Sequence, residues 1–125
     1  MRRYSEEHVW VEYENGIATI GVTSYAADEL GEITFVELPE SSVVLAAGDT
    51  LCVVESVKAA SDVIAPVGGT VTDVNGRLED EPTLINDAAE RDGWICRLTE
   101  VDEADLENLM TEPDYDEFVA GDDDD

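Results

Sequence analysis

Apolar and polar residues alternate along most of the chain, and this period of two indicates β-strands with one buried face. Stretches of this kind that are rich in β-branched residues predict strands at Val9 to Tyr13, Ile17 to Val22, Ile33 to Leu38, Leu51 to Ser56, Val63 to Ala65, Thr70 to Val74 and Trp94 to Leu98. Asn15-Gly16 predicts a hairpin turn between the first two strands, and Asn75-Gly76 predicts another tight turn. The fold is therefore expected to be mainly β.

Short helices are predicted where this alternation stops. A first helix is expected from Tyr25 to Leu30, because Thr23 or Ser24 can cap its start and Gly31 can end it. A second helix is expected from Asp102 to Met110, where apolar residues recur at helical spacing.

The end of the chain has a different composition. Pro113 to Val119 predicts one or two further helical turns, and the sequence then closes on four consecutive aspartates. Like charges in such a block repel one another and stay solvated. We therefore expect one domain of residues 1–120, a size that buries a single core, followed by a disordered acidic tail of residues 121–125.

The charge of the chain is extreme, because six basic and 32 acidic residues give a net charge of −26. No basic cluster is present, which argues against nucleic acid as a partner, since phosphate binding needs Lys and Arg. Disorder would also explain such acidity, but the carboxylates are interleaved with β-branched apolar stretches such as Ile17 to Val22. The preferred interpretation is a folded, salt-adapted domain from a haloarchaeon-like source, because repulsion between charges is screened within roughly 3 Å at about 1 M salt.

The sequence contains no stretch apolar enough to span a bilayer, and no apolar segment of a secretory signal follows Met1-Arg2-Arg3. We therefore expect a cytoplasmic protein without a membrane partner. Cys52 and Cys96 lie in apolar surroundings and are expected to be reduced buried thiols, with a disulfide between them as the less favoured alternative. Glycine loops for nucleotides, Cys-x-x-Cys pairs and zinc-protease motifs are absent, so neither a metal site nor a catalytic set is expected.

The segment VVESVKAASD, residues 53–62, contains Lys58, the single lysine of the chain. A Gly-x-Thr-apolar pattern occurs on both sides of it, in residues 48–51 and 68–71. Two matching turn-and-strand units predict that Lys58 lies exposed at the tip of a hairpin between them. A surface lysine paired with Glu55 or Asp62 is the plain alternative, but exposed pairs contribute only about 0–1 kcal/mol and seldom need preserving.

The residues around the lysine resemble a known family. Glu55-Ser56-Val57-Lys58-Ala59, followed by Ala65-Pro66-Val67-Gly68-Gly69, is similar to the lipoyl-lysine hairpin of the glycine cleavage system H-protein. The resemblance extends from His8 to about Met110 and includes Gly21-Val22-Thr23, Leu30-Gly31-Glu32, Phe35 to Pro39, Leu84-Ile85-Asn86 and Gly93-Trp94. It implies a flattened barrel-sandwich hybrid of two sheets, of the biotinyl/lipoyl-carrier type, with short helices including a C-terminal one.

The resemblance also implies a function, that of a non-catalytic carrier with lipoate joined to Lys58 through an amide. The hairpin context of this site would be Glu55, Ser56, Val57 and Ala59. The arm would carry the aminomethyl group of glycine from glycine decarboxylase to the aminomethyltransferase, and dihydrolipoamide dehydrogenase would reoxidise it. A lipoate ligase or lipoyl transferase would attach the group.

Two other classes of function stay open. An H-protein-like module that passes lipoate on, or that regulates without serving glycine, would have nearly the same sequence. A biotin carrier has a related fold, but biotinyl hairpins usually read Met-Lys-Met, whereas this hairpin reads Val57-Lys58-Ala59.

Acids near the hairpin, with Glu7 and Asp62 as the candidates, are expected to pair with the cationic amine of a loaded arm. The family often has a glutamate at the position of Val9, so a contact made by that side chain would be missing in this chain. His8, the single histidine, could titrate near neutrality, but a structural or surface role is the preferred interpretation.

Overall fold

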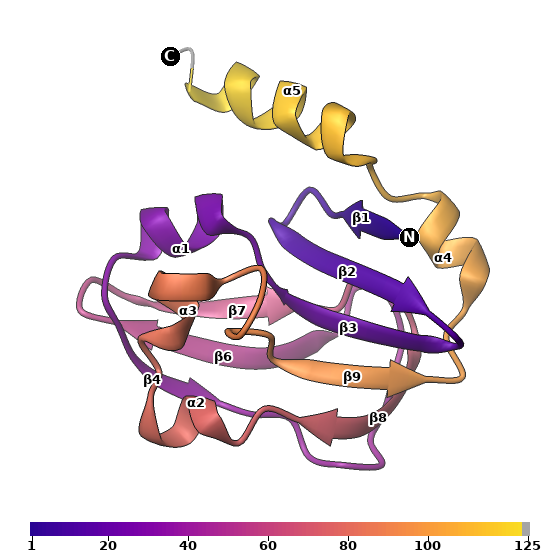
Figure 1. Ribbon diagram of the computed structural model, residues 1–125, viewed down its shortest axis with the longest axis horizontal. Coiled ribbons are helices and arrows are strands. Elements are labelled where there is room, and N and C mark those ends of the chain that lie inside the picture. The colour runs from indigo at the N-terminus through magenta and orange to yellow at the C-terminus, as the bar shows by residue number, and fades with distance from the viewer. Residues whose placement is uncertain (124–125) are drawn as a thin grey trace.

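The computed structural model describes residues 1–123, whose strands form two antiparallel sheets (Figure 1). The larger sheet has six strands in the order β1-β2-β3-β9-β8-β5, with bounds Arg2–Tyr4, Val9–Glu14, Ile17–Val22, Cys96–Thr99, Gly69–Val74 and Val44–Leu45. The smaller sheet has three strands in the order β4-β6-β7, with bounds Ile33–Glu37, Thr50–Ser56 and Ala60–Ile64. The expected mainly β fold of two sheets is confirmed, although the strands of residues 1–123 form no closed barrel.

Short helices connect or flank these strands. Their bounds are Ser24–Leu30 for α1, Arg77–Asp80 for α2, Leu84–Ala88 for α3, Glu103–Glu107 for α4 and Glu112–Asp123 for α5. The first begins after the side-chain cap of Thr23 and ends at Gly31, as the sequence predicted. Among residues 1–123, no helix is both long and apolar enough to cross a bilayer.

The core lies between the two sheets, because alternate side chains of each strand point inward. Val11 and Ile20 are opposite each other on the larger sheet, and Val36 and Val54 are opposite each other on the smaller one. All four are at most 2% exposed. Each such burial is worth about 1.5–3 kcal/mol relative to full exposure, so the pairs hold the sheets together.

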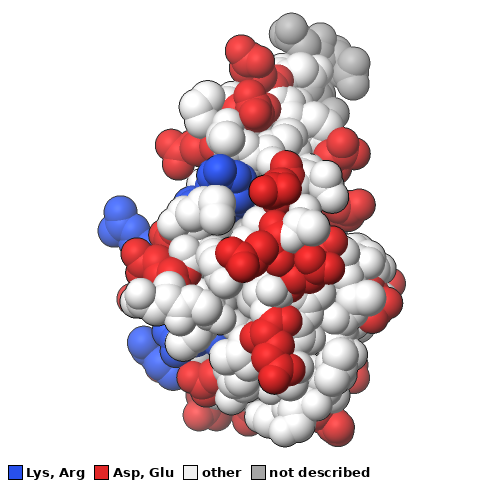
Figure 2. All heavy atoms as spheres, turned by 90° about the vertical axis from the view of Figure 1, so that its right-hand side faces the viewer, with Lys and Arg blue, Asp and Glu red and all other residues white. Residues whose placement is uncertain are grey.

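The carboxylates lie on the outside of this core. Figure 2 shows them spread over the face that it presents, with few basic side chains between them. Arg97 and Asp73 form one of the ion pairs on the larger sheet, at 3.2 Å. Most of the 32 acids therefore add to a surface of one sign, which destabilises the compact state by self-repulsion.

Several strand boundaries differ from those expected. The strand β7 begins at Ala60, earlier than the predicted Val63, because Glu55 of β6 pairs with Ala60 and so prolongs the hairpin. The strand β9 begins at Cys96, later than the predicted Trp94. The strands β1 and β5 were not predicted, because they are short and show no alternation of their own.

The expected tight turn at Asn75-Gly76 is in fact the entry to α2. Asn75 is buried, and its Nδ2 donates to the carbonyl oxygens of Asp92 and Trp94 at 2.8 and 2.9 Å. The asparagine therefore ties this corner to the segment before β9 and does not reverse the chain between two strands.

The C-terminal helix α5 is longer than the one or two turns expected from Pro113 to Val119. It continues to Asp123, into the segment for which we expected a disordered tail. Residues 124–125 lie outside the described residues. The division into a domain of residues 1–120 and a disordered tail of residues 121–125 stays a prediction.

Candidate functional site

Lys58 lies at the tip of the β6–β7 hairpin and is exposed, as the sequence predicted. The tip is closed by Ser56, whose Oγ accepts from the backbone N–H groups of Lys58 and Ala59, both at 3.2 Å. The N–H of Val57 donates to the carbonyl oxygen of Glu32 at 3.0 Å and ties the tip to the chain that follows α1. The hairpin therefore presents Lys58 from a backbone that is fixed on both sides.

The stem of Lys58 rests on Gly31, the residue that ends α1. A Cβ added to Gly31 would lie 3.2 Å from Lys58 Cε and 3.7 Å from Nζ, so the stem would have to shift by a few tenths of an ångström to admit any other residue. Gly31 also has a φ of +78°, a conformation that favours glycine. One residue thus meets two requirements, the end of the helix and the close approach of the lysine.

The amine of Lys58 has no ionic partner among the described residues. Within residues 1–123, no carboxylate lies within 4.0 Å of its Nζ, whereas the arginines at positions 2, 77 and 97 all form ion pairs. The alternative of a lysine paired with Glu55 or Asp62 is therefore wrong for this structure. The lysine is available for chemistry at its amine.

Side chains from α3 and the residues after it hold both ends of α1. At the C-terminal end, Asn86 Nδ2 donates to the carbonyl oxygen of Gly31 at 2.7 Å, and Asn86 Oδ1 accepts from the N–H of Ile33 at 2.9 Å. At the N-terminal end, Glu90 Oε2 accepts from the N–H of Ser24 at 2.9 Å. The helix on which the lysine stem rests is thus fixed in place by two side chains.

Comparison with known proteins agrees with this geometry. The family model described as "Glycine cleavage H-protein" matches residues 2–122. The chain belongs to the glycine cleavage H-protein family. The "Glycine cleavage system H protein" of Parvibaculum lavamentivorans is 50% identical over 117 residues, 94% of each chain, and that of Listeria innocua is 52% identical over 112 residues, 90% of each chain. The crystal structure of a glycine cleavage system H protein from Mycobacterium marinum has a TM-score of 0.82 at 31% identity and covers 91% of this chain and 92% of that one.

These H-protein relatives identify the family but not the source of the chain. The "Putative glycine cleavage system H protein, mitochondrial" of Schizosaccharomyces pombe is 42% identical over 98% of this chain and 72% of that one. Neither this organism nor any of those named above is an archaeon. The haloarchaeon-like source that we expected from the charge is therefore not supported.

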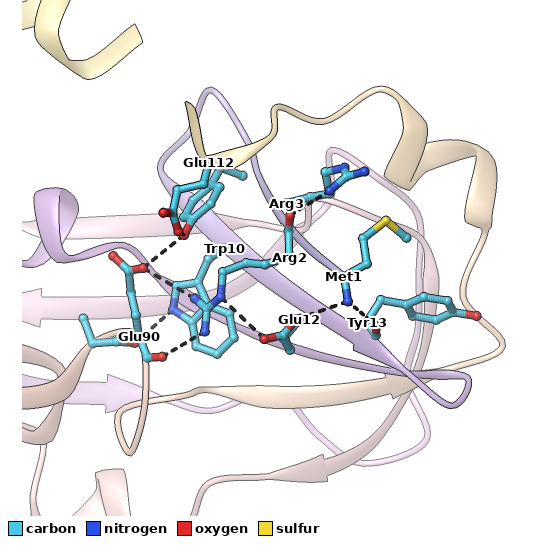
Figure 3. A network of polar contacts seen from close by, with 10 residues as sticks. Met1, Arg2, Arg3, Trp10, Glu12, Tyr13, Glu90 and Glu112 are labelled. Carbon is cyan, nitrogen blue, oxygen red and sulfur yellow. Dashed lines mark hydrogen bonds and ion pairs between the residues drawn. The ribbon is translucent and has the colours of Figure 1, made fainter. Parts of the chain in front are cut away.

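A polar network around Glu90 joins β1 to the start of α5 on one side of this H-protein fold (Figure 3). Arg2 donates from its Nη1 to Glu90 Oε1 at 3.4 Å and lies over the ring of Trp10 at 4.5 Å. Tyr4 has carboxylates on two sides, with its hydroxyl 3.4 Å from Glu90 Oε1 and 3.3 Å from Glu112 Oε2. Burial, followed by the charge of Glu90, raises the pKa of Tyr4 to about 12, so the phenol stays a donor.

His8 has a structural role in this H-protein. Its Nδ1 is 2.8 Å from the hydroxyl oxygen of Tyr115, which is in turn 2.8 Å from Thr23 Oγ1. Tyr115 also stacks on Tyr4 with ring centroids 4.7 Å apart. Tyr115 therefore links α5 both to the histidine and to Thr23 at the start of α1. The aromatic residues Tyr115 and Phe118 lie close together in the sequence, but no sequence signal places them against a histidine 107 residues earlier.

The two acids proposed for the loaded arm are not joined to the lysine. Glu7 is exposed between β1 and β2, and Asp62 is exposed on β7 opposite Val53. Within residues 1–123, no hydrogen bond or ion pair connects either acid to Lys58. Val9, where the family often has glutamate, is 1% exposed and lies in the core.

Both cysteines are free and buried. Burial raises the pKa of Cys52 to about 12 and also raises the pKa of Cys96, so neither forms a reactive thiolate near neutral pH. The expected reduced thiols are confirmed, and the disulfide between them is absent. Among residues 1–123, no three His, Cys, Asp or Glu side chains gather in a way that could hold a metal ion.

Proposed function

We propose that this H-protein is the lipoyl carrier of the glycine cleavage system and that the lipoyl group is joined to Lys58. The single observation that carries the proposal is the position of the only lysine, exposed at the tip of a fixed hairpin and without an ionic partner among residues 1–123. The residues fit the group, because Nζ is a primary amine, Ser56 holds the turn and Ala59 leaves space beside it. When bound, the lipoyl group supplies a disulfide that accepts the aminomethyl unit of glycine.

The role proposed for the chain itself is non-catalytic. Burial raises the pKa of the Cys52 thiol to about 12, and the histidine is bound to Tyr115, so neither is placed as a catalytic nucleophile or base. Glycine decarboxylase, the aminomethyltransferase and dihydrolipoamide dehydrogenase are the proposed partners, with a lipoate ligase or lipoyl transferase for attachment. A cytoplasmic, salt-adapted setting is proposed from the composition, since a net charge of −26 calls for strong screening.

The replacement of Lys58 by arginine tests the carrier role. Arginine keeps the positive charge and the long stem but cannot form the amide, so Lys58→Arg should fold like the parent and lack the lipoyl mass. Glycine decarboxylation with the purified partner enzymes should be abolished. An active Lys58→Arg protein, or a parent that gains no lipoyl mass on Lys58 after treatment with a lipoate ligase, would end the proposal.

Glu7 and Asp62 are the proposed acids for sheltering a cationic amine at the end of the arm, because both are exposed and carry no other ionic partner among residues 1–123. Asp62→Asn should shorten the lifetime of the loaded carrier and leave lipoylation unchanged. Glu14→Gln, which removes the same charge at the exposed end of β2, is the matched control. Equal lifetimes for Asp62→Asn and the parent would contradict this role.

A further inference from the structure

The outer face of the three-stranded sheet carries two rows of side chains, each running across the strands, and the first row lies near the hairpin tip that bears Lys58. Residues that pair across antiparallel strands point to the same face, and the pairing places Phe35, Glu55 and Ala60 in one row. The neighbouring row contains Glu37, Val53 and Asp62. The opposite face is the inward one, because it contains the buried Val36 and Val54.

The first row is unusual because its edge residue is aromatic. Phe35 is 49% exposed, although an outward position of an antiparallel sheet is normally polar. Val57, at the tip beside Lys58, is 65% exposed. A single exposed apolar residue needs no explanation, but here two of them belong to the same sheet and its hairpin, and one adjoins the lysine in sequence.

The charges on this sheet all have one sign apart from the lysine. Glu37, Glu55 and Asp62 are exposed, one on each strand, and no arginine lies on β4, β6 or β7. An exposed aromatic residue with charged residues at its border is the composition of a protein contact, with the aromatic side chain as the anchor. The complementary partner presents an apolar recess bordered by Lys or Arg.

We propose that this face, with Phe35 as its anchor, docks the enzyme that forms the amide on Lys58. The inference rests on the proposed function and adds to it a surface and an anchoring residue. An enzyme that acts on the end of a long arm can work at a distance from the hairpin, whereas the attaching enzyme must bring its active site to Nζ itself. Lys58 is three residues from Glu55, at most about 10 Å along the chain, and Phe35 lies one strand spacing from Glu55, about 5 Å.

The step itself requires this close approach. The neutral amine of Lys58 attacks the carbonyl carbon of an activated lipoyl group, such as an acyl phosphate anhydride supplied by the attaching enzyme. A C–N bond forms, the C–O bond to the phosphate breaks, the phosphate leaves with the electron pair of that bond, and Nζ gives up a proton to solvent. Among residues 1–123 no hydrogen bond or ion pair holds Nζ, so the rate depends on how well the two surfaces hold the reacting atoms together.

The test measures attachment with a purified lipoate ligase, lipoic acid and ATP, followed by intact-mass spectrometry. Phe35→Ala should lower kcat/KM for attachment about tenfold, since truncation of an aromatic anchor at a contact commonly has an effect of this size. Ile17→Ala is the control, because Ile17 is 41% exposed on the larger sheet, and it should leave kcat/KM unchanged. Acetylation of Lys58 by an N-hydroxysuccinimide ester should proceed equally in both variants and the parent.

Each outcome decides the proposal. The proposal is overturned if lipoyl attachment to Phe35→Ala proceeds at the parent rate. It is also overturned if acetylation of Lys58 in this variant falls as much as lipoyl attachment does, because that would show an altered hairpin. Unchanged attachment with impaired glycine decarboxylation would assign the face to an enzyme that handles the loaded arm, which also overturns it. Failure of the parent to accept a lipoyl group would instead refute the proposed function, so the two failures are distinguishable.

Discussion

Replacement of Gly31 by alanine should destabilise the protein through the backbone of a single residue. Gly31 ends α1 with φ +78° and ψ −157°, a region that is essentially restricted to glycine. Holding a residue with a Cβ in such a conformation costs about 1–3 kcal/mol. For 125 residues, each kcal/mol shifts the midpoint of thermal unfolding by about 4 °C, so Gly31→Ala should melt about 4–12 °C below the parent.

The new Cβ also meets the stem of Lys58, and this contribution can be separated from the strain. The contact of 3.2 Å falls on Cε of a flexible side chain, which can move aside at little cost. In a double-mutant cycle, Lys58→Ala should therefore recover less than about 0.5 kcal/mol of the loss in Gly31→Ala, because the strain remains.

Thermal melts followed by circular dichroism at one fixed salt concentration measure the effect. Gly76→Ala is the matched control, since Gly76 has an ordinary helical conformation with φ −59° and ψ −20°, and nothing lies within 4 Å of an added Cβ. Its midpoint should stay within about 2 °C of the parent. A Gly31→Ala midpoint that also stays within that range would refute the assignment of strain to this residue. Recovery of most of the loss by Lys58→Ala would show that the contact with the lysine dominates.

Two further predictions concern the solution conditions. The midpoint should rise steeply with KCl, because the net charge of −26 is poorly screened at a Debye length of about 8 Å near 0.15 M, and equal midpoints in dilute and concentrated KCl would contradict this. The midpoint of thermal unfolding should also fall as the pH rises above about 8.5, because the pKa of Cys52 is about 12 in the fold and unfolding then releases its proton. The Cys52→Ala midpoint should fall less with pH. Equal slopes of midpoint against pH for this variant and the parent would contradict the assignment.

The alternation of apolar and polar residues was sufficient to predict most of the strands and the hairpin at Asn15-Gly16. It could not predict β5, because a two-residue strand has no measurable period, nor the early start of β7 at Ala60. Small residues such as Ala60 have weak strand propensity, and pairing with Glu55 decides their conformation instead. Tertiary pairing thus determined the boundaries where local preference was weak.

The candidate site, too, could be predicted from the sequence only in part. The exposure of Lys58 followed from the sequence around it, because the matching glycine turns bracket the hairpin. The roles of Asn86 and Glu90 at the two ends of α1 did not, since both lie more than fifty residues from the groups that they bind. Hydrogen bonds of this kind leave no periodic signal, and only the folded chain brings the partners together.

The N-terminal strand β1 packs against Met110 and against α5, so the fold is completed late in the synthesis of the chain. Tyr4 exchanges backbone hydrogen bonds with Met110 at 2.9 and 2.8 Å, and its ring stacks on Tyr115. Because a ribosome releases the N-terminus first, the ring of Tyr4 remains without its stacking partner Tyr115 until α5 has emerged. A nascent chain interrupted before α5 would therefore expose an aromatic surface to chaperones and proteases, although both sheets were already complete.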